Sequence, residues 1–103
     1  MRVGEAVLGP PQAEVCLVVM HEFEDAQQIA DRYRADIPVI ANMQSCEAGL
    51  ATRLIDFCSG LTYALGGGLQ RIDDRVFLLA PHNVDLSSEA TARFLERGFF
   101  NQV

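Results

Sequence analysis

The spacing of apolar residues changes along the chain, and each change predicts a new element. Residues 15–20 form an unbroken apolar run of strand length, which is typical of a strand covered on both faces. Over residues 24–35 the apolar positions recur every three or four residues, which predicts an amphipathic helix. This helix should end before Pro38, because the residue preceding a proline avoids helical backbone angles. Residues 39–43 are again apolar and predict a second buried strand.

The chain is organised around residues 53–81, which predict a helix followed by a hairpin. Ser45 is a suitable cap for this long helix, and three glycines at 66–68 should end it through a residue with positive φ. Residues 69–73 and 76–80 predict two strands joined by a tight turn. The apolar face of the helix recurs at steps of three and four: Leu50, Leu54, Phe57, Cys58, Leu61 and Leu65.

The two ends of the chain are predicted to differ. Residues 1–14 contain two adjacent prolines and are expected to form a flexible lead without regular structure. Ser87 or Ser88 should cap a third helix that ends at Gly98, and residues 99–103 form a tail.

The predicted order of elements is β-α-β-α-β-β-α within one domain, residues 15–98. Strand-helix-strand units favour parallel strands, whereas the hairpin adds an antiparallel pair. We therefore expect an α/β fold, a two-layer sandwich with a mixed sheet.

Charge and cysteine content narrow the classes of partner. The chain has 14 acidic and 8 basic residues, for a formal charge of -6. Every basic residue is Arg, and none of them cluster, so nucleic acid and anionic lipid are not expected partners. Three cysteines without a close pair argue against a disulfide framework and fit a reducing cytosol.

Residues able to carry catalysis are few and scattered. His21 beside Glu22 is a candidate acid-base pair, but adjacent residues on an extended chain diverge and no third group is identifiable. Cys46, at the start of the long helix, is the candidate for a thiol with a lowered pKa. Cys16 and Cys58 are expected in the core. The histidines and cysteines lack ligand spacing, so we expect neither a metal nor another cofactor, and no enzyme activity.

Apolar residues exceed what one small sandwich needs on its inner faces. The surplus lies in residues 50–65, in residues 76–79 and at the terminal Phe99 and Phe100. Such a surplus on a small domain favours a protein partner, often a second copy of the same chain.

Three segments together resemble the core domain of the SepF family of bacterial cell-division proteins. They read PVIANM at 38–43, RLIDFCSGLTYALGG at 53–67 and VFLLAP at 76–81. The resemblance spans about residues 15–86. It implies a cytoplasmic, non-enzymatic adaptor near the inner face of the membrane. Such an adaptor dimerises and binds the C-terminal tail of FtsZ, the tubulin-like protein of the division site. Family members typically begin with an amphipathic membrane-binding helix, a pattern that residues 1–14 do not show, so the anchor is not expected in this chain.

The resemblance also implies site residues, each with a structural alternative. Phe77 and Leu79 would form the apolar floor of the tail site, and Arg71 a polar contact on the hairpin. Either apolar residue could instead belong to the core, and Arg71 could be an ordinary solvated residue. The residues expected at the self-association contact are Phe57, Leu61, Gly66 and Gly67.

Three hypotheses for function follow. The first is an adaptor that binds FtsZ, self-associates and supports assembly of the division septum. The second is a SepF-like regulatory paralogue that dimerises but lacks the membrane or FtsZ contact. The third is a small enzyme that uses His21, Glu22 or Cys46.

Overall fold

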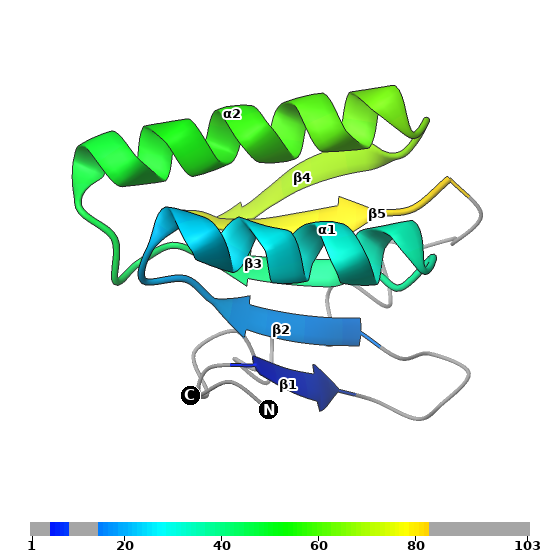
Figure 1. Ribbon diagram of the computed structural model, residues 1–103, viewed down its shortest axis with the longest axis horizontal. Coiled ribbons are helices and arrows are strands. Elements are labelled where there is room, and N and C mark those ends of the chain that lie inside the picture. Colours follow the sequence, from blue (N-terminus) through cyan, green and yellow to red (C-terminus); the bar gives the residue numbers. More distant parts are fainter. Residues whose placement is uncertain (1–4, 9–14, 83–103) are drawn as a thin grey trace.

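The computed structural model describes residues 5–8 and 15–82 of the 103-residue chain. These residues form a sheet with two helices packed on it (Figure 1). The predicted α/β two-layer architecture is confirmed. In chain order the elements are β1 (Glu5–Leu8), β2 (Val15–Val19), the 3₁₀ helix η2 (Phe23–Asp25), α1 (Ala26–Arg34), β3 (Val39–Asn42), α2 (Ala48–Ala64), β4 (Gly68–Asp73) and β5 (Val76–Ala80).

The sheet has the strand order β1-β2-β3-β5-β4. Strands β2 and β3 run parallel, as expected for strands joined by a helix, and the other neighbouring strands are antiparallel. The sheet is therefore mixed, as predicted. In the hairpin only β5 pairs with the rest of the sheet, which leaves β4 at the edge.

The prediction that residues 1–14 carry no regular structure was wrong for four of them. Strand β1 covers Glu5–Leu8 and pairs antiparallel with β2, from Glu5 opposite Val18 to Leu8 opposite Val15. The physical reason is pairing with β2, which completes the backbone hydrogen bonds on that side of β2. The predicted third helix and tail lie outside the described residues.

Both helices cover the same face of the sheet. Side chains from α1 and α2 share one apolar cluster with inward-facing residues of β2, β3 and β5, including Ile29, Tyr33 and Leu54, which are at most 2% exposed. On the opposite face a second buried cluster contains Val15, Leu17 and Ile40. Strands β2 and β3 are thus covered on both faces, as their unbroken apolar runs predicted.

Carboxylates cap the starts of η2 and α2. At η2, one Asp25 oxygen accepts hydrogen bonds from the backbone N–H groups of His21 (2.8 Å) and Glu22 (3.1 Å). At α2 the cap is Glu47, whose side chain accepts from the Leu50 N–H at 2.7 Å. Ser45 was therefore the wrong prediction for this cap. The helix begins two residues later than a Ser45 cap requires, and the Glu47 side chain reaches the free N–H groups of its first turn.

The glycines after α2 close the helix and admit a close contact. Gly66 has a φ of +75°, and the N–H of Gly67 donates to the Thr62 carbonyl at 2.9 Å, the pattern of a Schellman motif. A Cβ at Gly67 would overlap both the Tyr33 hydroxyl and the Ala80 carbonyl oxygen. The Tyr33 hydroxyl itself donates to that carbonyl at 3.2 Å. These three residues join α1, the start of β4 and the end of β5, and we call them the junction.

Candidate partner-binding site

Arg71 and Phe77 lie directly opposite each other on the hairpin, at the edge of the sheet. Arg71 of β4 is in register with Phe77 of β5, so both side chains are on the same face. Phe77 is half-buried against the core beneath the helices. The Arg71 side chain is 64% exposed. An exposed arginine and a half-buried aromatic residue are therefore cross-strand neighbours.

Leu79 lies on the same strand but has no exposed surface. It is opposite Leu69 on β4 and Val39 on β3, and its relative exposure is 0%. In the folded chain its side chain belongs to the core cluster. It lies on the same face of β5 as Phe77, two residues further along the strand.

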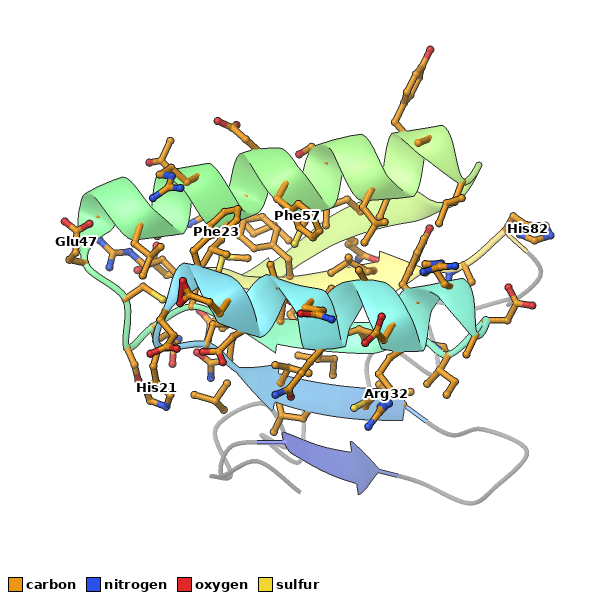
Figure 2. The ribbon with its side chains drawn as sticks, in the orientation of Figure 1. His21, Phe23, Arg32, Glu47, Phe57 and His82 are labelled. Carbon is orange, nitrogen blue, oxygen red and sulfur yellow. The ribbon has the colours of Figure 1, made fainter. Side chains whose placement is uncertain are left out.

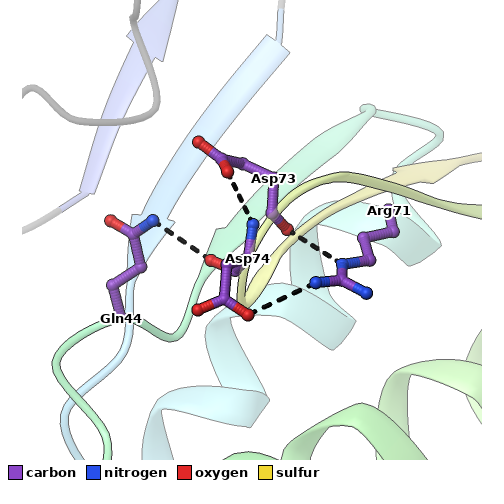
Figure 3. Close-up of polar contacts among 4 residues, drawn as sticks. All are labelled: Gln44, Arg71, Asp73 and Asp74. Carbon is purple, nitrogen blue, oxygen red and sulfur yellow. Dashed lines mark hydrogen bonds and ion pairs between the residues drawn. The ribbon is translucent and has the colours of Figure 1, made fainter.

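The turn between the two strands holds Arg71 through a set of polar contacts (Figure 3). Arg71 Nη2 lies 3.3 Å from Asp74 Oδ1, and its Nε donates to the Asp73 carbonyl at 3.4 Å. The Asp74 N–H donates to Asp73 Oδ1 at 2.7 Å. Gln44, on the loop between β3 and α2, donates from its side-chain amide to the Asp74 carbonyl at 3.1 Å.

Arg75 fastens this turn to the body of the domain. Its φ of 57° is in the left-handed region, which is uncommon for a residue with a side chain. Its Nη1 donates to the Cys46 carbonyl at 2.7 Å, and its own carbonyl accepts from the Met43 N–H at 2.7 Å. We call Arg71, Asp73, Asp74 and Arg75 the tip. The sequence predicted a tight turn between residues 73 and 76 and indicated no role for Arg75.

Two residues predicted for self-association lie on the side of α2 that packs against the core. Phe57 and Leu61 of α2 are half-buried against the core. The Phe57 ring lies beside the Phe23 ring (Figure 2) and meets it edge-on, with centroids 6.2 Å apart. The Arg53 guanidinium lies 4.6 Å from the Phe23 centroid. Near the end of α2, Tyr63 and Leu65 are 88% and 44% exposed.

The two glycines predicted for self-association occupy different environments. Gly66 is exposed, whereas Gly67 is half-buried in the junction. The close neighbour that Gly67 allows is therefore the chain's own Tyr33. Both glycines are at the opposite end of the hairpin from Arg71.

Cys46 is not an activated thiol. It is 5% exposed, and its Sγ donates to the Met20 carbonyl at 3.3 Å. Burial raises the pKa of Cys46, and the nearby Asp25 carboxylate adds to that rise while Arg75 opposes it. The expectation of a lowered pKa was wrong, because burial of the sulfur and the nearby carboxylates outweigh the opposing charge of Arg75.

The other candidates for chemistry are also placed without an active-site arrangement. His21 and Glu22 are exposed at the end of β2, and their backbone N–H groups serve the Asp25 cap. Burial raises the pKa of Cys58 to about 12. Within residues 5–8 and 15–82, no group of three His, Cys, Asp or Glu side chains could hold a metal ion. In the same ranges, no helix has the length and apolar character needed to cross a membrane.

Comparison with known proteins agrees with the sequence motifs. The family model described as "Cell division protein SepF" matches residues 15–86. A protein of that name from Desulfitobacterium hafniense is 48% identical over 91 residues, covering 86% of this chain and 60% of the relative. One from Rubrobacter xylanophilus is 47% identical over 89 residues, covering 86% of this chain and 48% of the relative. The chain thus spans about half of the length of these relatives. It belongs to the SepF family of cell-division proteins.

Proposed function

We propose that this chain is a non-enzymatic division adaptor that binds the C-terminal tail of FtsZ through Arg71 and Phe77 and associates with a second copy of itself. The observation that carries the proposal is the cross-strand pair of an exposed guanidinium and a half-buried aromatic ring on an edge hairpin. In this role the protein acts at the division site, near the inner face of the membrane, where it supports assembly of the septum.

The chemistry of this pair suits a short peptide. Aromatic residues and Arg dominate binding energy at protein interfaces, because a large ring buries apolar area and a guanidinium offers several hydrogen-bond donors in a fixed plane. A peptide can place an apolar side chain against Phe77 and a carboxylate against Arg71. Leu79, on the same face of β5, is fully buried and so anchors the strand in the core beside that contact.

The edge position of β4 adds a second means of recognition. Within residues 5–8 and 15–82, β4 pairs with β5 alone, so no described strand covers the backbone N–H and C=O groups of its other edge. An extended peptide can pair with such an edge while its side chains reach the neighbouring residues. This favours a flexible tail as the ligand over a folded domain.

Self-association is proposed at α2. Phe57 and Leu61 are half-buried apolar residues of α2, and the exposed Tyr63 and Leu65 follow at the end of the helix. Apolar side chains left accessible on a small domain favour contact with a second copy. Gly66, exposed at the end of the helix, allows close approach of a neighbouring backbone.

Fluorescence anisotropy with a labelled peptide that copies the FtsZ tail tests this function. Phe77→Ala should weaken binding at least tenfold, since truncation of an aromatic anchor typically costs 2 kcal/mol or more at an interface, roughly thirtyfold. Phe57→Ala is the matched control, because both rings are half-buried against the same core. It should retain tail binding and instead lower the dimer fraction measured by light scattering.

The outcomes separate the proposed functions. Equal loss of tail binding in both variants would point to general destabilisation and remove Phe77 from the site. A folded dimer that binds no tail peptide would refute the adaptor function and favour the regulatory SepF-like paralogue.

A further inference from the structure

We propose that Asp74 is an intramolecular competitor for Arg71, and that it thereby limits the affinity of this site for partner segments that carry a carboxylate. The proposal rests on the proposed function, because it concerns the same guanidinium. Asp74 would thus influence specificity through its contact with Arg71, without touching the bound peptide.

The geometry of the tip places a carboxylate where a ligand's carboxylate would bind. Asp74 Oδ1 lies 3.3 Å from Arg71 Nη2, and the Asp73 carbonyl occupies Nε at 3.4 Å (Figure 3). A bidentate contact with an incoming carboxylate uses two donors on one edge of the guanidinium. Such a contact along the Nε–Nη2 edge requires Arg71 to leave the turn.

The contact is built into the turn and does not depend on a mobile side chain alone. The Asp74 N–H is held by Asp73 Oδ1 at 2.7 Å, and the Asp74 carbonyl by the Gln44 side chain at 3.1 Å. On the next residue, Arg75 is anchored to the Cys46 carbonyl and the Met43 N–H. The backbone of Asp74 is thus fixed on both sides, and its carboxylate stays within reach of Arg71.

The competition is weak enough to be displaced. The Arg71 and Asp74 side chains are 64% and 80% exposed, so water and salt screen their attraction. Exposed ion pairs of this kind shift an equilibrium by at most about fivefold. Asp74 therefore reduces the affinity for a carboxylate-bearing segment without blocking the site.

The sequence offers a matched control in the neighbouring residue. Asp73 carries the same charge, but its carboxylate accepts the Asp74 N–H, and only its backbone carbonyl meets Arg71. Asp73→Asn and Asp74→Asn each remove one negative charge, and only the second removes the carboxylate that pairs with Arg71. Comparing the two isolates the competition from the general electrostatic effect.

The test is titration of the labelled FtsZ tail peptide with the wild type and both variants. Asp74→Asn should bind roughly two- to fivefold more tightly than Asp73→Asn. In an Arg71→Gln background the two variants should bind alike. The same comparison with a peptide whose Asp and Glu residues are replaced by Asn and Gln should show no difference between them.

Each result decides between the two proposals. Tail binding with equal affinities for Asp73→Asn and Asp74→Asn would overturn the competition and leave the adaptor function standing. A difference that persists in the Arg71→Gln background would also overturn it. Failure of the wild type and both variants to bind the tail would refute the adaptor function and this inference together.

Discussion

The two ends of the β4–β5 hairpin, the junction and the tip, differ in how tightly their residues are packed. At the junction, Gly67, Tyr33 and Ala80 meet so closely that a single added carbon would overlap two neighbours. At the tip, Arg71 and Asp74 form an exposed ion pair that solvent screens. We therefore expect substitutions at the junction to lower stability and substitutions at the tip to be tolerated, which leaves the tip available for the proposed recognition.

This difference changes how the glycine motif is understood. Glycines beside a proposed contact suggest an assembly site, and Gly67 was predicted to be one. Its close neighbour is within the same chain, so a bulky substitution there would disturb the fold before it could report on self-association. The chain offers better probes of self-association at Phe57 and Leu61.

The largest expected effect is at the junction. Gly67→Ala should lower the free energy of unfolding by about 3 kcal/mol or more, because its Cβ meets a backbone carbonyl that cannot rotate away. Gly60→Ala, in the exposed middle of α2 with no atom within 4 Å of the added carbon, should raise it by about 0.5–1 kcal/mol. Urea denaturation measures both. Similar stabilities for the two variants would refute the packing described at Gly67.

An intermediate effect on the free energy of unfolding is expected from pH, because a buried thiol, that of Cys58, titrates differently in the folded and unfolded chain. Cys58 has a folded pKa of about 12 against an ordinary value of 9.0. Above pH 9 the unfolded chain loses this proton while the folded chain keeps it, so stability falls as pH rises, by at most about 1.4 kcal/mol per pH unit for this group. The raised pKa values of Cys46 and Tyr33 act in the same direction.

Urea denaturation at pH 8 and pH 10 measures this dependence. Cys58→Ala should lose less stability over that interval than the wild type, because one of the contributing groups is gone. An unchanged loss would show that Cys58 does not contribute to it.

The smallest effect on stability is expected at the tip. Arg71→Gln removes an exposed ion pair and should change the free energy of unfolding by no more than about 0.5 kcal/mol. Thermal unfolding followed by circular dichroism would check this. A decrease of several kcal/mol in the free energy of unfolding would show that the tip, like the junction, is needed for stability.

The sequence correctly predicted those helices and strands in which the apolar residues follow one clear spacing. The apolar steps through Leu54 and Cys58 correctly place these residues in the core, and the apolar run at 15–20 correctly indicates a strand covered on both faces. Strand β1 escaped prediction because four residues show little periodicity, and the strand depends on pairing with β2.

The details of the site were less predictable, because they depend on contacts between distant residues. Arg75 donates to the carbonyl of Cys46, which is 29 residues earlier in the sequence, and no local sequence pattern predicts such a hydrogen bond. The same holds for the burial that raises the pKa of Cys46. The binding role of Arg71 and Phe77 is a prediction from the resemblance to the family. The ion pair between Arg71 and Asp74 is seen only in the folded structure.

The most direct test is to map the backbone amide NMR shifts of the labelled protein while the FtsZ tail peptide is added. We predict that the shifts concentrate on β4 and β5 from Arg71 to Phe77 and fade toward Gly67 and Ala80. Shifts centred on the junction, or spread evenly over the domain, would contradict the claim that recognition lies at the tip end of the hairpin.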